Sequence, residues 1–274
     1  ISDEVTIMRD GQWISTDKTE NLSTDDIIKR MVNREMTNRF PAKDNVPGDV
    51  LMEVSHLTGK YMPTCQDVSF ELRAGEVLGV TGLLGDGRSE LFSAVFGAEP
   101  MSAGEIRLCG QAVRITSTRQ AKRLGIAYVP RNRKENGIIK DMSILENGTI
   151  VSWPDLMRRG LLNHEKQRAE FNEEKAALHI KMGGENDSIT SLSGGNQQKV
   201  VLAKWLSREP KVLILDNPTQ GVDVGAKEEI YDIILKLAKE GVSVIVLSSE
   251  AQEIIRVCDR ALVMYHGEIV GEVS

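Results

Sequence analysis

The chain has 274 residues, enough for one large domain or two small ones. Apolar residues at 41% and charged residues at 27% are ordinary for a globular protein. The net charge of −6 argues against a nucleic-acid binder, which carries a basic excess. No apolar run approaches the roughly 20 residues of a membrane-spanning helix. Cys65, Cys109 and Cys258 lack metal-ligand spacing, and we expect free, buried thiols.

Two segments far apart in the sequence, residues 3–14 and residues 259–270, resemble each other. Each segment reads as a strand, a tight turn at a glycine (Gly11 or Gly267) and a second strand, with Asp and Met recurring in the same frame. Such a repeat predicts that the first segment ends a preceding copy of the domain to which the second segment belongs.

This repeat sets the expected domain boundaries. Residues 1–47 would be the tail of a preceding domain plus a linker, and residues 48–274 the whole of the next domain. Within the first part, Ser23 and the polar residues after it can cap a short helix. The two prolines within residues 40–48 are typical of a linker.

Strands and helices alternate through the larger part. The apolar runs at 212–215 and 242–247 are typical of parallel strands that are covered on both faces. Residues 142–182 are different, because they read as a helical insertion with a charged, solvated face. The pattern as a whole predicts an α/β fold with a parallel sheet. The expected strands are 51–57, 68–72, 77–81, 106–108, 113–115, 212–215 and 242–247, and the expected helices are 89–96, 196–206 and 226–239.

A glycine-rich loop between a predicted strand and a predicted helix carries the first chemical motif. Its sequence, GLLGDGRS at residues 82–89, matches the phosphate-loop pattern G-x-x-x-x-G-K-[ST], except that Arg88 replaces the lysine. Backbone N–H groups of such a loop face phosphate oxygens, and Ser89 offers a hydroxyl to Mg²⁺. The alternative is a glycine-rich turn without a ligand. The candidate nucleotide contacts are Gly82, Gly85, Asp86, Gly87, Arg88, Ser89 and Glu90.

The second motif is an apolar strand that ends in an acid, VLILD at residues 212–216. Asp216 would lie at the carboxyl end of the sheet beside the phosphate loop and hold Mg²⁺. The alternative for Asp216 is a helix cap before Pro218. In a site that hydrolyses ATP, the residue after this aspartate should be a second carboxylate, which polarises the attacking water. Asn217 occupies that position and cannot accept a proton at neutral pH.

The third motif, LSGGNQQ at residues 192–198, opens a predicted helix. A serine and two glycines at a helix start leave a row of N–H donors exposed, which makes a second anion site. Its candidate nucleotide contacts are Ser193, Gly194, Gly195 and Gln197.

These three motifs, in this order, resemble an ATP-binding cassette. The resemblance is greatest to the second nucleotide-binding domain of bacterial sugar-import ATPases of the ribose and galactoside type. It runs over residues 50–274 and includes YVPRNRK at 128–134 and GVDVGAKEEIY at 221–231. It implies a P-loop NTPase fold, with a RecA-like core, an antiparallel β subdomain and a helical subdomain at about residues 140–210.

The chain departs from the pattern of this family at several positions. By resemblance, Arg131 stands where cassettes carry a glutamine that contacts Mg²⁺ and the permease. The switch histidine that cassettes carry after the last buried strand is replaced by Ser248 or Ser249, a loss that the sugar-import second domains share, and we expect Ser249 at the matching position. Asn217 stands where relatives keep a catalytic glutamate. Tyr61 lies where cassettes stack an aromatic ring on adenine, with ordinary packing as the alternative.

The resemblance also implies a mechanism and partners. Cassettes pair head to tail, so that the LSGGNQQ loop would complete the ATP site of a preceding domain in the same polypeptide, while the chain's own site is degenerate. We expect an ATPase half, weak or inactive alone, that binds ATP and Mg²⁺ at the cytoplasmic face of the bacterial membrane. Its partners would be permease subunits and, indirectly, a periplasmic or extracellular sugar-binding protein, and not nucleic acid. The alternatives are a cassette protein outside transport and a regulatory nucleotide sensor without turnover.

Overall fold

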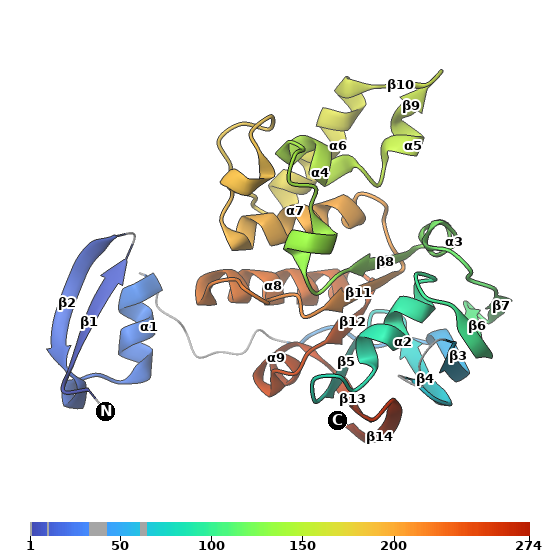
Figure 1. The fold of residues 1–274 in the computed structure, drawn as a ribbon, viewed down its shortest axis with the longest axis horizontal. Coiled ribbons are helices and arrows are strands. Elements are labelled where there is room, and N and C mark those ends of the chain that lie inside the picture. The colour runs from blue at the N-terminus through green and yellow to red at the C-terminus, as the bar shows by residue number, and fades with distance from the viewer. Residues whose placement is uncertain (1, 10, 33–42, 61–64) are drawn as a thin grey trace. The chain divides into compact units, whose positions relative to one another are not determined.

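The computed structural model describes residues 2–9, 11–32, 43–60 and 65–274 (Figure 1). The chain divides into two compact units, Ile1–Ala42 and Lys43–Ser274. Tyr61, the candidate for stacking on adenine, lies outside the described residues.

The first unit is an antiparallel hairpin followed by a helix. Gly11 has φ +77° in the hairpin turn, a conformation that favours glycine. Ser23 and Asp26 form a reciprocal cap, because each side chain accepts a hydrogen bond from the backbone N–H of the other, at 3.1 and 3.2 Å. The predicted capped helix is therefore confirmed. The elements are β1 (Glu4–Arg9), β2 (Gln12–Lys18), the 3-10 helix η1 (Thr19–Asn21) and α1 (Thr24–Val32).

The second unit is built on a six-stranded sheet with the order β14-β13-β5-β12-β11-β8. Neighbouring strands run parallel except β13 and β14, which form an antiparallel hairpin. The predicted α/β fold with a mainly parallel sheet is thus confirmed. The strands are β5 (Val77–Gly82), β8 (Ile126–Val129), β11 (Val212–Asp216), β12 (Ser243–Leu247), β13 (Arg260–Tyr265) and β14 (Glu268–Val273).

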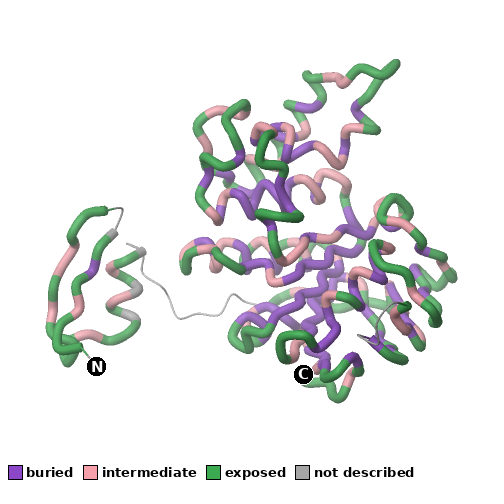
Figure 2. Tube along the Cα trace, viewed as in Figure 1, coloured by how far each residue is buried: buried purple, intermediate pink, exposed green. Residues whose placement is uncertain are grey.

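Both faces of this sheet are covered, which explains the uninterrupted apolar runs in the sequence. Leu213 and Val244 point to a core shared with α7 (Gly194–Leu206) and α8 (Val224–Lys239). Their strand neighbours point to a second core shared with α2 (Arg88–Val95) and the antiparallel strands. The strands β11 and β12 are buried along their whole length (Figure 2).

An antiparallel sheet with the order β4-β3-β6-β7 packs beside α2. The sequence placed the second strand of its last hairpin at residues 113–115, and this register was wrong. Cys109 and Gly110 both have positive φ, +52° and +74°, and form a two-residue turn that starts pairing immediately at Gln111. The same turn exposes Cys109, whereas Cys65 and Cys258 are buried as predicted. The strands are β3 (Val50–Gly59), β4 (Val68–Arg73), β6 (Met101–Leu108) and β7 (Gln111–Val113).

The insertion is mainly helical, and its helices α4 and α6 pack on each other and on α7, which follows the insertion. Contrary to the expectation of helix throughout, it contains a short hairpin of β9 (Met157–Arg158) and β10 (Leu161–Leu162). Arg159 and Gly160, both at positive φ, make the two-residue turn that explains it. The remaining helices are α3 (Thr118–Arg123), the π-helix η2 (Arg133–Gly137), α4 (Ile144–Thr149), α5 (Trp153–Leu156), α6 (His164–Ala177), the 3-10 helix η3 (Ile189–Ser191) and α9 (Ala251–Val257).

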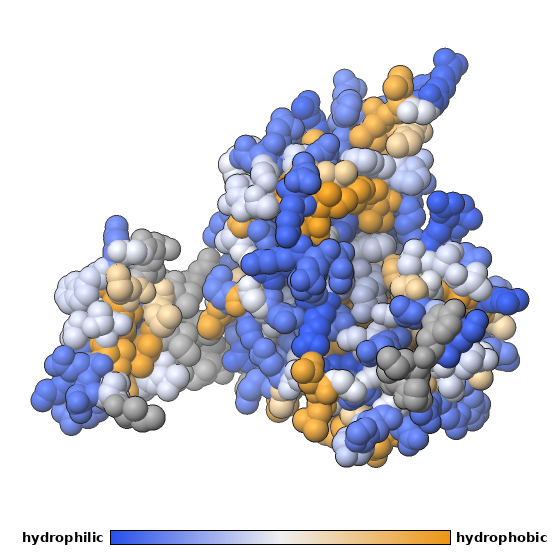
Figure 3. Space-filling model, in the orientation of Figure 1, coloured by the Kyte–Doolittle hydropathy of each residue, from blue (hydrophilic) through white to orange (hydrophobic). Residues whose placement is uncertain are grey.

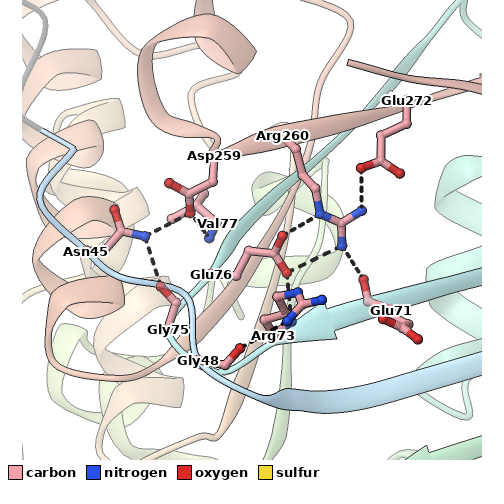
Figure 4. A network of polar contacts seen from close by, with 10 residues as sticks. All are labelled: Asn45, Gly48, Glu71, Arg73, Gly75, Glu76, Val77, Asp259, Arg260 and Glu272. Atoms are coloured by element: carbon pink, nitrogen blue, oxygen red, sulfur yellow. Dashed lines mark hydrogen bonds and ion pairs between the residues drawn. The ribbon is translucent and has the colours of Figure 1, made fainter. Parts of the chain in front are cut away.

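A polar network holds the start of this unit against its sheet (Figure 4). The Asn45 side-chain amide donates to the Gly75 carbonyl and to Asp259 Oδ2, at 2.9 and 2.8 Å. Arg260 donates to Glu76, which is 2% exposed, and so joins β13 to the start of β5. The segment before β3 is therefore part of this unit's structure.

The surface of the molecule is mostly hydrophilic on the face shown in Figure 3, and apolar residues gather there in separate patches. Within the described residues, every helix is too short or too polar to cross a membrane.

Candidate functional site

The loop between β5 and α2 and the carboxyl ends of β8 and β11 surround one pocket of about 510 Å³. Parallel strands place their carboxyl ends at the same edge of a sheet, which is where open α/β folds bind ligands. This arrangement brings Arg88, Ser89 and Asp216 together, although Asp216 is more than a hundred residues away in sequence. The lining residues are Leu84, Gly85, Asp86, Gly87, Arg88, Ser89, Glu90, Ser93, Tyr128, Pro130, Arg131, Asn132, Asn136 and Asp216.

The backbone of the loop fits a phosphate group. Gly85 and Gly87 have φ +82° and +93°, so both adopt a conformation that other residues rarely take. At Gly82 a Cβ atom would lie 2.4 Å from the Met264 carbonyl oxygen, which requires a glycine there. Gly87 begins α2 without a side-chain cap, so the first turn of the helix presents backbone N–H donors at the pocket.

The arginine of the loop is turned inward. Arg88 is 3% exposed, and its Nη1 atom donates to Asp86 Oδ2 and to the Gly82 carbonyl, both at 2.9 Å. A carboxylate that is itself 3% exposed thus neutralises the charge that this motif normally directs at phosphate. Ser89 and Glu90 also line the pocket.

Both carboxylate oxygens of Asp216 accept hydrogen bonds from neighbouring side chains. The Tyr128 hydroxyl donates to Oδ2 at 3.1 Å, and the Asn217 amide donates to Oδ1 at 2.7 Å. Burial, reinforced by the charge of Asp216, raises the pKa of Tyr128, so that its hydroxyl keeps its proton at neutral pH. Asp216 and Ser89 are oxygen ligands of the kind Mg²⁺ takes, and each Asp216 oxygen has a second lone pair that could bind the ion while these hydrogen bonds remain.

Asn217 occupies the position expected for a catalytic carboxylate. Its backbone has φ +49°, which asparagine tolerates better than most residues, and its N–H donates to the Leu247 carbonyl at 2.8 Å. Of the two serines considered at the switch position, Ser248 is fully buried and accepts from the Glu250 N–H at 3.0 Å. Ser249 is exposed, and neither serine lines the pocket.

The predicted signature residues lie outside this pocket. Ser193 is exposed and caps α7 by accepting from the Asn196 backbone N–H. The two glycines are needed for close packing: a Cβ at Gly194 would lie 2.8 Å from the Gly221 carbonyl oxygen, and one at Gly195 would lie 2.5 Å from the Ala226 Cβ.

Gln197 has a different environment from the rest of the signature loop. It is 7% exposed and donates to the Leu192 carbonyl at 3.1 Å. Ser193 is therefore the exposed residue of the loop, whereas Gln197 faces inward.

Two residues that the sequence did not single out shape the site. Tyr128 reaches Asp216 across neighbouring strands. Arg133, buried at the start of η2, donates to the Gln220 carbonyl at 2.5 Å and to the Gly221 carbonyl at 2.8 Å. Both contacts join segments nearly 90 residues apart, so the sequence signals were the place of these residues within or just after a buried strand and their presence in the YVPRNRK segment.

The sequence of the chain is similar to those of known proteins. Residues 65–220 match the family model described as ABC transporter. The chain is 43% identical over 275 residues to a galactose/methyl galactoside import ATP-binding protein of Vibrio vulnificus, covering 100% of this chain and 55% of that protein. It is 44% identical over 268 residues to a ribose import ATP-binding protein of Halalkalibacterium halodurans, covering 97% and 53%. The chain thus spans about half the length of the curated relatives it matches.

Solved structures agree on the fold. A nucleotide-free ATP-binding cassette from an ABC transporter superposes with TM-score 0.71 at 20% identity, covering 82% of this chain and 91% of that one. An ATP-binding cassette solved as a dimer in a post-hydrolysis state with ADP and phosphate gives TM-score 0.69 at 22% identity, covering 81% and 97%.

Proposed function

Since the chain belongs to the ABC transporter family of ATP-binding domains, we propose that it is the ATP-binding half of an importer that energises the uptake of a sugar. The support comes from relatives named for ribose and galactose import. A xylose import ATP-binding protein of Photobacterium profundum is also 44% identical over 278 residues. The transported sugar would be chosen by the permease and by an external binding protein, not by this chain.

We further propose that the chain's own nucleotide site is degenerate. The observation that carries this proposal is the hydrogen bond from the Asn217 amide to Asp216 Oδ1 at 2.7 Å. This bond holds a carboxamide beside Asp216, where a catalytic site needs a carboxylate, and a carboxamide cannot take a proton from water at neutral pH. The pairing of Arg88 with Asp86 supports the same conclusion, because it removes positive charge from the transferring phosphate. Phosphate can still bind through the backbone of the loop and Ser89.

The signature loop would then serve a partner. Ser193 is exposed at the start of α7, away from the pocket of this chain, so its donors are free to complete a nucleotide site on another cassette. ATP turnover would then be asymmetric, because one site hydrolyses ATP and the other only holds it. Closure of the two cassettes on each other would drive the permease.

We propose that the partner cassette precedes this one in the same polypeptide. The hairpin of β1 and β2 has a register shift between Ile7 and Met8, and the hairpin of β13 and β14 has one between Val263 and Met264. Each irregularity falls at the same distance from its turn glycine. Because β13 pairs with β5, the strand that leads into the phosphate loop, β1 would pair with the matching strand of a preceding domain.

The remaining partners follow from the same proposal. Permease subunits would hold the pair of cassettes at the cytoplasmic face of the bacterial membrane, and a periplasmic or extracellular sugar-binding protein would act through the permease. Nucleic acid is not an expected partner at a net charge of −6.

Titration with ATP–Mg²⁺, followed by measurement of phosphate release, tests the degenerate site. We expect saturable binding with phosphate release near background, and loss of binding in Gly87→Val, which blocks the left-handed turn. Gly271→Val is the matched control, because Gly271 has neither positive φ nor a neighbour within 4 Å. Brisk turnover by the unmodified chain would overturn the proposal.

A regulatory nucleotide sensor without turnover and a cassette protein acting on ribosomes or DNA are the alternatives. Purification of the full-length protein from its native membrane distinguishes them. Recovery of a polytopic membrane protein in fixed ratio supports import, whereas nucleotide binding with ribosomes or DNA in place of a membrane partner supports the alternatives.

A further inference from the structure

A second polar pocket, of about 850 Å³, lies at the opposite edge of the parallel sheet from the nucleotide pocket. Gly125 and Lys211, which directly precede β8 and β11, line it, whereas Asp216 at the carboxyl end of β11 belongs to the nucleotide pocket. Its walls come from β7, α3 and α5, which Figure 1 shows along the same side of this unit. The two pockets share no lining residue.

Positive charge is concentrated in this pocket. Its basic residues outnumber its acids, although acids outnumber basic residues by 40 to 34 in the whole chain. The acids are Asp155 and Glu209. The basic residues are Arg119, Lys122, Arg123, Arg208 and Lys211.

Helix α3 supplies three of these cations on one side. Arg119, Lys122 and Arg123 stand at spacings of three and four residues, which places their side chains next to one another on a helix. Like charges at these spacings destabilise a helix. Ser117 caps the helix by accepting from the Gln120 N–H, so α3 forms despite this repulsion.

The acids do not neutralise this cluster. Asp155 is shared between Lys122 at 3.8 Å and Arg208 at 3.0 Å. Arg119 and Arg123 have no ion pair within the described part of the chain. Burial lowers the pKa of Lys122, Asp155 opposes that shift, and the nearby arginines favour it. The cluster therefore has positive charge left over for a ligand.

We propose that this pocket binds a small phosphate ester, whose phosphate is held by Arg119 and Arg123 with Lys211 on the facing wall. Guanidinium groups bind phosphate in a two-pronged geometry. The volume lies within the range of small-molecule pockets. Leu108, Val113 and Pro154 also line the pocket and offer apolar contact to the organic part of the ester.

A thiol at the rim provides a local reporter of occupancy. Cys109 is exposed in the turn between β6 and β7, lines the pocket, and has its Sγ 4.0 Å from Lys211 Nζ. Cys65 and Cys258 are buried and serve as internal references. Protection of Cys109 from the neutral reagent iodoacetamide reports this pocket, even if the same probe also enters the nucleotide pocket.

The experiment measures the alkylation rate of Cys109 by mass spectrometry, with glucose 6-phosphate as the probe. At a probe concentration about ten times its Kd, alkylation should slow about tenfold. The double variant Arg119→Gln with Arg123→Gln should lose this protection. Arg158→Gln with Arg159→Gln, which removes two exposed arginines outside the pocket, should retain it.

Three results would overturn the proposal. Potassium chloride at matched ionic strength could protect Cys109 equally, which would mean charge screening alone. Inorganic phosphate could protect it as well as the ester does, so that the organic part is not recognised. Protection could also occur only with a short RNA oligonucleotide, which would make the cluster a nucleic-acid contact. None of these outcomes depends on whether the chain hydrolyses ATP, so the proposal stands or falls independently of the proposed function.

Discussion

The phosphate loop on the parallel sheet and the signature loop at the start of α7 carry equally recognisable sequence motifs, but their environments differ. In the phosphate loop, Arg88 is buried against Asp86, so the positive charge of its guanidinium group is neutralised within the loop. In the signature loop, Ser193 is exposed at the start of α7 and its glycines are fixed by close packing. A motif thus supplies the backbone of a binding site, whereas neighbouring side chains decide whether its charge reaches the ligand.

The largest expected effect comes from restoring the lysine and the glutamate that are missing from the nucleotide site. Arg88→Lys combined with Asn217→Glu should raise phosphate release about 10²–10⁴-fold, because it supplies a positioned general base. The rate of phosphate release at saturating ATP–Mg²⁺ is the measurement. Arg88→Lys combined with Asn217→Gln is the control, since glutamine has the same length without a proton-accepting group. Equal rates in the two double variants would show that the missing carboxylate is not the cause.

Breaking the pair inside the phosphate loop should cost stability. Arg88→Met leaves Asp86 buried without its partner, which should lower the free energy of unfolding by about 3–5 kcal/mol. Lys236→Met, which removes an exposed partner 3.9 Å from Glu240, should cost less than about 1 kcal/mol. Urea unfolding measures both changes. Similar losses would contradict our view that Arg88 is structural.

Crowding at the signature loop should have a smaller effect. Gly195→Ala places a Cβ 2.5 Å from that of Ala226, which should lower the free energy of unfolding by about 1–3 kcal/mol. Gly271→Ala meets no atom within 4 Å and should change it by less than about 0.5 kcal/mol. Thermal unfolding of the two variants is the measurement. A tolerant Gly195 would mean that packing does not require glycine in this loop.

The smallest effect concerns the junction between the helical insertion and the parallel-sheet region. There, α6 and α8 line a common pocket of about 480 Å³. Burial, together with Glu170 and Glu173, raises the pKa of Glu174 there to about 7 from 4.5. The folded chain therefore holds this proton more tightly than the unfolded chain, and the resulting stability is lost as pH rises from about 4.5 through about 7.

Glu174→Gln should flatten the pH dependence of the free energy of unfolding in that window. Glu165→Gln, an exposed change on the same helix, should leave the slope as it is. The comparison is made by urea unfolding at a series of pH values. An unchanged slope in the Glu174 variant would remove this residue from the junction's pH response.

Local patterns in the sequence predicted most of the fold. The apolar runs in the sequence form β11 and β12, and they are apolar because both faces of the sheet are covered. The capped helix α1 starts where Ser23 predicts. The errors fell on short hairpins. The register of β7 and the existence of β9 and β10 depend on two-residue turns with positive φ at Cys109 and Arg159, residues that seldom take this conformation.

The sequence by itself determined the positions of the phosphate and signature loops, because a strand, a glycine-rich turn and a helix start are neighbours along the chain. Tertiary structure decided which side chains contact one another in the nucleotide site. The contact of Tyr128 with Asp216 and the bridge from Arg133 to Gly221 each join segments 88 residues apart, so they depend on the pairing of β8 with β11, which brings together these strands and the segments that follow them. The inward turn of Arg88 toward Asp86, only two residues away, also required the folded loop, because burial leaves the guanidinium no competing water.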